Sequence, residues 1–370
     1  MSKTWQDSLT GLSIVSAAVV DDGIFAFGAN WDETYAGPKP PAKYHNRLVC
    51  CDLNAGTWGG KQYDGGFDFA RVAGGQTAHG APQALFTDAM GNITAFTFPD
   101  GPRGKEHPVE VRGANRLRFI GDHFYICGDG RSLLRRDAPD AWTVFNHVPF
   151  VSRETDLGAF GPFDGLSDAD IFMWYAGPYD SNATDRKPGI EHWNGTDFRQ
   201  VPLPTELFED VPWAPFRAHD ICCTPDGQVF VSGTKGELLL GGREGFVVLA
   251  PQVQNALPGM NLCWFKDVLY GAIDAGLFTF DFKENSWVPA PFAGDPNAPV
   301  HFPHIDANEN VMLLAGAYGA AIFDGDIWTS LAGDVSALDV TRVRLMEQQV
   351  EGLEELRDIV QDLATGTPDD

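Results

Sequence analysis

The feature that most constrains this 370-residue chain is a short hairpin signal that recurs along most of its length. Each copy has an apolar segment, a turn rich in Asp, Asn or Gly, and a second apolar segment that often ends in Gly, a pattern typical of antiparallel strands joined by tight turns. Seven copies occur, at Val20–Gly28, Thr87–Phe96, Ile120–Gly128, Ser167–Gly177, Thr224–Gly233, Phe265–Gly271 and Asn308–Gly316. Internal repetition of this kind indicates an array of similar β units.

A second signal follows most of the hairpins: an apolar strand, a polar turn, and an aromatic residue that opens the next strand. These aromatic residues are Trp58, Trp142, Phe198, Phe246, Trp287 and Trp328. They recur every 41 to 56 residues, except for one interval of 84 that spans two repeats and would hold the missing copy near His107–Val109. Seven units of roughly 45 residues predict an all-β fold, a seven-bladed β-propeller of four-stranded antiparallel blades over residues 1–332.

The physics of a single blade supports a closed ring. A four-stranded blade has two apolar faces and cannot bury both alone, whereas a ring of blades buries each face on a neighbour and protects the sheet edges. We therefore interpret the recurring aromatic residues as packing between blades.

Two stretches carry a resemblance to a known repeat family. Phe25–Gly28, Asn46–Asp52 and Trp58 together look like a kelch repeat, and Leu277–Trp287 is similar. The double glycine that kelch repeats carry after the second strand is absent, because Ala29 follows Gly28. The WD40 resemblance is weaker, since no Trp-Asp pair closes the strands. The resemblance implies a propeller and no particular activity.

The pattern changes after the last repeat, over residues 333–370. Residues 337–364 contain no Pro, and apolar side chains recur every three or four residues, which predicts one long amphipathic α-helix ahead of an acidic tail. Its apolar stripe consists of Val343, Met346, Val350, Leu353, Leu356, Val360 and Leu363. Such a stripe needs a partner surface. Self-association as a coiled coil into a homo-oligomer, docking on the chain's own propeller, and docking on another protein are the alternatives.

The charge balance limits the kinds of molecule that this chain is expected to bind. The chain carries 51 acidic and 26 basic residues, a net charge of −25. Such a surface repels nucleic-acid phosphates and anionic lipids, and it attracts a basic protein over long range. We expect no nucleic-acid partner and no membrane association, since no run of about 18 apolar residues is present.

The cysteines and the first residues predict a cytoplasmic protein. The segment Met1–Asp7 lacks the apolar core of a signal peptide. Six cysteines occur without any Cys-x-x-Cys spacing, and Cys50–Cys51 and Cys222–Cys223 are adjacent pairs. Neighbouring residues of a strand point to opposite faces, so each pair is expected to divide between two packing layers as buried, reduced thiols.

Segment lengths predict a binding face. In a blade whose strands run A to D outward, the A–B and C–D turns lie on one face, and the B–C loops and inter-blade connections lie on the other. The long segments, 29–45, 145–162, 178–188 and 202–217, all belong to the second face. Long loops on a rigid scaffold concentrate function, and Trp, Tyr and Arg anchor interfaces. The candidate partner-binding residues are Trp31, Tyr35, Tyr44, Arg153, Tyr179 and Trp213.

We find no motif for chemistry. Walker A, Gly-x-Ser-x-Gly, His-Glu-x-x-His and EF-hand patterns are all absent, so we assign no catalytic residue, metal or cofactor. His79, His219 and His304 lie in or near innermost strands, but their differing offsets from the next turn argue against a ring of metal ligands. The prediction is a non-catalytic protein-binding propeller that neutralises or scaffolds a basic partner, in the manner of a toxin-immunity protein. The alternative is a small-ligand or glycan-binding propeller, or a hydrolase, with its site at the channel mouth.

Overall fold

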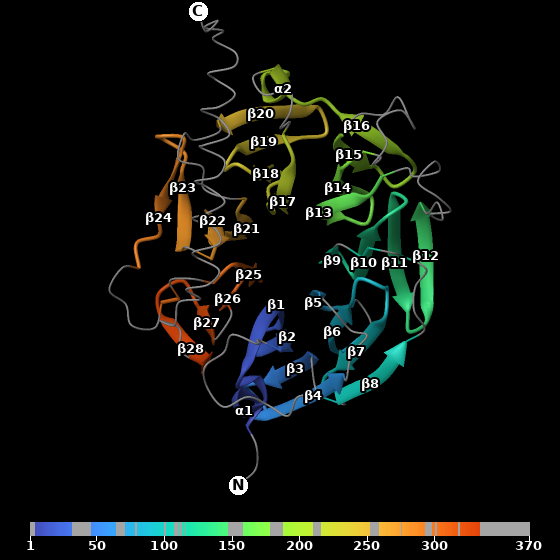
Figure 1. The fold of residues 1–370 in the computed structure, drawn as a ribbon, viewed down its shortest axis with the longest axis vertical. Helices are drawn as coiled ribbons and strands as arrows, with labels where there is room; N and C mark the ends of the chain where they lie inside the picture. Colours follow the sequence, from blue (N-terminus) through green and yellow to red (C-terminus); the bar gives the residue numbers. More distant parts are fainter. Residues whose placement is uncertain are drawn as a thin grey trace, which may run out of the picture.

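The protein is a ring of seven β-sheets around a central channel (Figure 1). The structure, a computed structural model, describes residues 4–31, 46–63, 71–77, 80–99, 101–106, 111, 113–114, 116–146, 158–177, 188–209, 216–251, 259–274, 276–292, 298–299, 302–316 and 319–333. Each sheet has four antiparallel strands that follow one another in the chain. The predicted seven-bladed propeller of four-stranded blades is confirmed.

The strands of the first four blades are β1 (Leu12–Asp21), β2 (Ile24–Trp31), β3 (Asn46–Asp52) and β4 (Thr57–Tyr63); β5 (Arg71–Gln76), β6 (Pro82–Thr87), β7 (Ile93–Thr97) and β8 (Gly101–Glu106); β9 (Arg116–Ile120), β10 (His123–Gly128), β11 (Ser132–Ala138) and β12 (Ala141–Asn146); and β13 (Phe160–Ser167), β14 (Asp170–Tyr175), β15 (Gly189–Trp193) and β16 (Phe198–Val201). The last three blades consist of β17 (Ala218–Cys223), β18 (Val229–Gly233), β19 (Leu238–Gly242) and β20 (Gly245–Ala250); β21 (Asn261–Phe265), β22 (Val268–Ile273), β23 (Gly276–Asp281) and β24 (Ser286–Pro289); and β25 (His304–Ala307), β26 (Met312–Gly316), β27 (Gly319–Phe323) and β28 (Trp328–Gly333). Two short helices, α1 (Trp5–Leu9) and α2 (Glu206–Glu209), flank the sheets.

The first strand of each blade lines the channel, because these strands contact one another around the ring. Six of the seven predicted hairpins join the first strand to the second, as β1 joins β2. The copy at Thr87–Phe96 is the exception, since it joins β6 to β7 in the second blade. Local sequence cannot distinguish the two positions, because both are tight turns between buried strands.

The core consists of seven apolar clusters, and each lies between two neighbouring blades. Cys50 packs in the layer between the first and second blades, whereas Cys51 packs between the seventh and first. Cys222 and Cys223 divide in the same way around the fifth blade. The predicted division of each pair between two layers is therefore confirmed. All six cysteines are free thiols.

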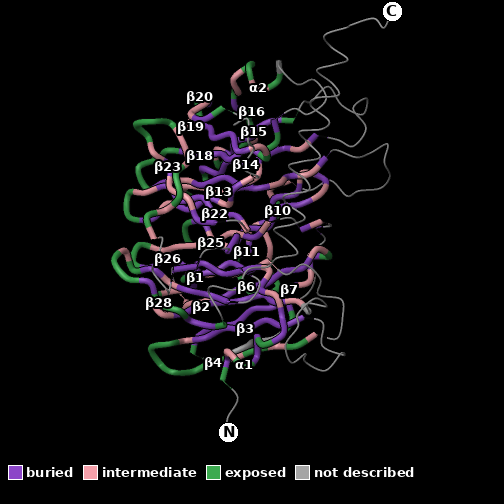
Figure 2. The backbone as a smooth tube through the Cα atoms, turned by 60° about the vertical axis from the view of Figure 1, so that its left-hand side comes forward, coloured by how far each residue is buried: buried purple, intermediate pink, exposed green. Residues whose placement is uncertain are grey.

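Most of the recurring aromatic residues pack between blades as predicted. Trp328 is 2% exposed and packs in the layer shared by the sixth and seventh blades, and Phe246 is buried between the fourth and fifth. Trp58 is the exception, because it is 40% exposed on the outer strand β4. Figure 2 shows buried residues along the strands and exposed residues gathered in the turns on one side of the ring.

The ring closes without strand exchange between its ends, since every blade uses four consecutive strands. Helix α1 helps to join the first and seventh blades. Its Trp5 stacks on Phe27 of β2 with ring centroids 5.6 Å apart, and Gln6 donates a hydrogen bond to the carbonyl of Leu331 in β28. Asn308 and Asn310, in the turn before β26, donate to the carboxylate of Asp22 in the first blade.

The long C-terminal helix predicted over residues 337–364 lies outside the described residues and stays a prediction, as do its seven stripe residues. No helix among the described residues is both long and apolar enough to cross a membrane.

Removing residues 334–370 should leave a folded propeller. The 28 strands among the described residues are complete at Gly333, so we expect the free energy of unfolding to change by less than about 1 kcal/mol. Urea unfolding and light scattering check this. If the truncated chain is a monomer and the untruncated chain is larger, self-association through the helix is supported. If both chains are monomers, docking of the helix in cis or on another protein is favoured. A truncated chain that fails to fold would contradict the domain boundary.

Candidate functional site

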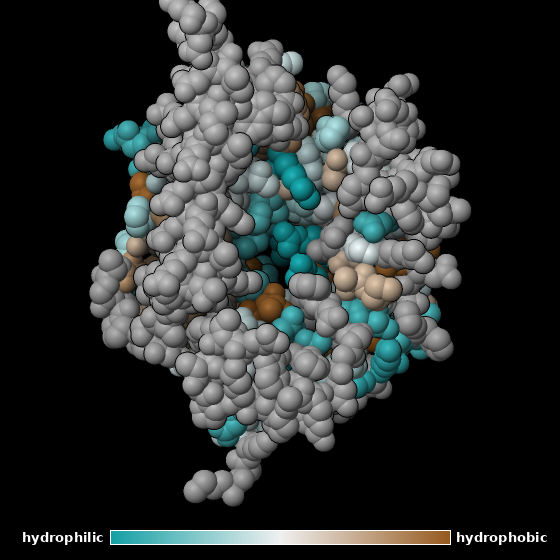
Figure 3. Space-filling view, viewed as in Figure 1, coloured by the Kyte–Doolittle hydropathy of each residue, from teal (hydrophilic) through white to brown (hydrophobic). Residues whose placement is uncertain are grey.

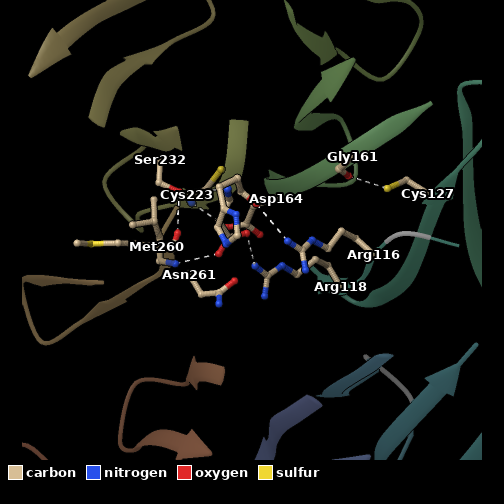
Figure 4. A network of polar contacts seen from close by, with 12 residues as sticks. Arg116, Arg118, Cys127, Gly161, Asp164, Cys223, Ser232, Met260 and Asn261 are labelled. Carbon is tan, nitrogen blue, oxygen red and sulfur yellow. Dashed lines mark hydrogen bonds and ion pairs between the residues drawn. The ribbon is translucent and has the colours of Figure 1, made fainter. Parts of the chain in front are cut away.

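The channel wall carries a charged network centred on Arg118 of β9. Its guanidinium lies 3.2 Å from a carboxylate oxygen of Asp220 in β17. Burial alone would lower the pKa of Arg118, but the carboxylates of Asp220, Asp164 and Asp306 raise it instead. Figure 4 shows Arg116, Arg118 and Asp164 converging on the channel from neighbouring strands. The guanidinium of Arg118 therefore interacts electrostatically with three carboxylates, each from a different blade.

Each of these aspartates also joins its own blade to the next. Asp164 in β13 accepts the backbone N–H of Cys223 at 2.7 Å, and Asp220 accepts that of Leu262 in β21 at 2.9 Å. These bonds tie the fourth blade to the fifth and the fifth to the sixth, since a carboxylate is a strong acceptor for a buried N–H.

The third aspartate closes the ring. Asp306 in β25 accepts the backbone N–H of Val19 in β1 at 2.8 Å, which ties the last blade to the first. Burial raises the pKa of the Asp306 carboxyl to about 6 and also raises that of Asp164. In both groups the charge of Arg118 and the hydrogen bonds from backbone N–H groups lower the pKa and so offset part of the effect of burial.

A cavity of about 580 Å³ opens at the mouth of this channel. Its lining includes Arg71 and Arg116, at the starts of β5 and β9, and Arg217 and His219, at the start of β17. The inner strands begin on the face that holds the inter-blade connections, so the cavity lies on the predicted loop-rich face. Figure 3, viewed as Figure 1, shows hydrophilic side chains gathered at the centre of the ring.

The charges at the mouth are mainly positive. Arg116 donates a hydrogen bond to the carbonyl of His219 at 3.1 Å, which holds its guanidinium against β17. Burial lowers the pKa of Arg71, and the nearby charge of Arg116 lowers it further. The pKa of His219 is also lowered, first by burial, because Asp220 offsets this effect only in part. Among the described residues that line the cavity, Asp129 is the one carboxylate.

Trp31, one of the predicted partner-binding residues, ends β2 on the same face as the cavity. Tyr35, Tyr44, Arg153, Tyr179 and Trp213 lie outside the described residues. The strand ends that flank their segments, such as the end of β14 and the start of β15, lie on this face too, because Gly177 and Pro188 line the cavity. All six residues stay predictions.

Two of the three histidines considered as metal ligands fall among the described residues. His219 lines the cavity, His304 lies in β25, and His79 is outside the described residues. Among the described residues, no group of three or more His, Cys, Asp and Glu side chains is arranged to hold a metal ion.

Sequence reasoning missed the arginines of the channel. One signal was present: Arg116 and Arg118 are two residues apart directly before the hairpin at Ile120, so both side chains share one face of the innermost strand. Two basic residues on a channel-facing strand of an acidic protein indicate a charged channel. Arg71 and Arg217 carried no comparable signal.

Fold and site together define a seven-bladed β-propeller with a charged channel and a cationic mouth. No protein-family model matches the chain. The chain is 25% identical over 258 residues to "Immune protein Tsi7" of Pseudomonas aeruginosa, which covers 68% of this chain and 74% of that protein.

Two solved structures share the fold. The computationally designed protein Ika8 is 10% identical with a TM-score of 0.51, covering 88% of both chains. PorZ, a component of the type-IX secretion system of Porphyromonas gingivalis, is 12% identical with a TM-score of 0.55, covering 84% of this chain and 46% of PorZ. At these identities the likeness concerns the fold alone. The propeller and the similarity to an immunity protein are compatible with a protein-binding, immunity-like role.

Proposed function

We propose that this protein is a non-catalytic, kelch-like or WD40-like propeller that neutralises a basic protein partner, such as an antibacterial toxin. The observation that carries the proposal is the similarity to an immunity protein, which extends over 258 residues and so includes most of the propeller. We further propose the cytoplasm as its location, because all six cysteines are free thiols and disulfides are rare in that compartment.

We infer a basic partner from the net negative charge of this chain. A net charge of −25 attracts a cationic protein and speeds its association, and this effect weakens as salt is added. The loop-rich face, with Trp31, Tyr35, Tyr44, Arg153, Tyr179 and Trp213, is the surface that we propose for the contact, since aromatic and Arg side chains dominate binding energy at interfaces. The C-terminal helix would add a second binding element or assemble several copies of the face.

The purified full-length chain should capture a basic protein from a lysate of its source organism. We expect recovery at about 50 mM salt and a loss of at least tenfold at about 500 mM, because screening at high salt removes long-range attraction. Mass spectrometry identifies the captured protein. Co-expression with that protein should then restore growth to cells that it inhibits.

Matched variants locate the contact. Trp31→Ala and Tyr44→Ala should weaken capture about tenfold each, since truncating a central aromatic anchor costs more than 1 kcal/mol. Trp58→Ala is the control, because Trp58 is an exposed aromatic residue on β4, next to the turns of the opposite face. Recovery of acidic proteins only, or equal capture by all variants, would count against a basic partner on the loop-rich face.

A further inference from the structure

We infer that the cavity at the channel mouth is a binding site for an anionic group, a carboxylate or a phosphate. The inference concerns the chemistry of the cavity and does not depend on the toxin-neutralising role. The anionic group belongs either to a free small anion or to an acidic side chain of a protein partner that docks on the loop-rich face.

The cation set comes from three blades. Arg71 belongs to the second blade, Arg116 to the third, and Arg217 lies at the entry to the fifth. Guanidinium groups are the side chains best suited to carboxylates and phosphates, because their N–H groups form paired hydrogen bonds to two oxygens. Three of them around one cavity provide such donors from several directions.

The charge of the cavity opposes that of the protein. The chain as a whole carries −25, yet the cavity gathers three arginines against the single carboxylate of Asp129 among its described lining residues. The acidic residues of the channel, Asp164 and Asp220, lie deeper along the inner strands and are already engaged with Arg118 and backbone N–H groups. Low-dielectric walls around one sign of charge strengthen the local field. Anions are therefore favoured at the mouth and cations over the rest of the surface.

The size and the walls fit a small group. A volume of about 580 Å³ lies within the range of small-ligand cavities, roughly 300 to 1,000 Å³. Trp174 and Phe216, with ring centroids 5.5 Å apart, supply an apolar wall.

The test uses the full chain with three probes: inorganic phosphate, N-acetyl-glutamate amide as an acidic side chain, and N-acetyl-glutamine amide as its neutral equivalent. We expect an anionic probe to raise the thermal midpoint at about 10 mM or below and the glutamine probe to leave it unchanged, because ligand binding to the folded state stabilises it. Calorimetric titration then measures the dissociation constants. A preference for phosphate points to a free anion, and a preference for the glutamate probe points to a partner's side chain.

Arg116→Gln and Arg217→Gln should each weaken binding at least about tenfold, the loss expected when one charge-assisted pair is removed. Arg217 is exposed, so its replacement keeps the fold even if Arg116→Gln disturbs the bond to His219. Arg199→Gln is the control, since Arg199 is an exposed arginine of β16 on the outer edge of its blade. The inference is overturned if neither anion shifts the midpoint at about 10 mM, or if Arg217→Gln binds as tightly as the wild type.

Discussion

Replacing Arg118 with Met should lower the free energy of unfolding by about 2 to 4 kcal/mol at pH 7, because breaking a buried ion pair leaves uncompensated charge behind. Three carboxylates, those of Asp164, Asp220 and Asp306, depend on this guanidinium. The side chain of Arg118 keeps 28% of its surface exposed, so solvent in the channel screens part of the loss. Urea unfolding measures the effect.

The loss should shrink as the pH falls. Burial raises the pKa of the Asp164 and Asp306 carboxyls, and Arg118 offsets part of this effect. Without Arg118 both pKa values rise further above their unfolded values, so protonation of these two groups favours the folded protein. Stability is then regained below the raised pKa values, and the deficit at pH 5 should be smaller than at pH 7. Arg199→Met removes an exposed pair with Asp197 and should cost less than about 1 kcal/mol. A loss in Arg118→Met as small as in this control would show that the channel network does not stabilise the ring.

Replacing Asp306 with Asn should change how stability depends on pH. The pKa of this carboxyl is raised by burial from 3.8 to about 6, so its ionisation above pH 6 opposes folding. In the wild type, its favourable contribution is complete below about pH 4 and is lost as the pH rises through about 6. This shift corresponds to at most about 3 kcal/mol at 1.4 kcal/mol per unit, and partial exposure to the channel reduces it.

The amide cannot ionise, and its oxygen can still accept the N–H of Val19. The stability of Asp306→Asn relative to the wild type should therefore rise by about 1 to 3 kcal/mol between pH 4 and pH 7. Urea unfolding at both pH values measures the difference. Asp226→Asn is the control, because that carboxyl is exposed and hydrogen bonds from Thr224 and Gln228 lower its pKa, so burial does not oppose its ionisation. A difference between wild type and Asp306→Asn that stays constant from pH 4 to 7 would contradict the role given to burial.

The blades could be predicted from the sequence because their signals are local. A tight turn such as Thr224–Gln228 and the alternation of side chains along a strand depend on neighbouring residues, and so does the division of Cys50 and Cys51 between two layers. The hairpin predicted at Thr87–Phe96 is also present, but it joins β6 to β7 and not the first strand to the second. A local turn signal shows that two strands form a hairpin, but the position of that hairpin in its blade depends on the strand before it, Arg71–Gln76, whose two glycines weaken the strand pattern.

The closed ring leaves no space for a side chain at the two glycines of β5, Gly74 and Gly75. A side chain at Gly74 would lie 2.3 Å from the backbone oxygen of Val19, because the first and second blades approach closely at the channel. No property of the sequence around Gly74 announces that contact. The sequence around Trp58 likewise does not predict its exposure, which depends on its place at the start of the outer strand β4.

The repeat alone determined that this chain forms seven blades, since each blade is specified by turns and alternation within about 45 residues. Only the tertiary structure decided what lines the channel. Arg118 and Asp220 are 102 residues apart, and Val19 and Asp306 are 287 apart. Closure of the ring brings them within hydrogen-bond distance, and it gathers Arg71, Arg116 and Arg217 around one cavity. Charges from separate blades act together only after the blades meet, so the chemistry of the channel mouth is a property of the closed ring.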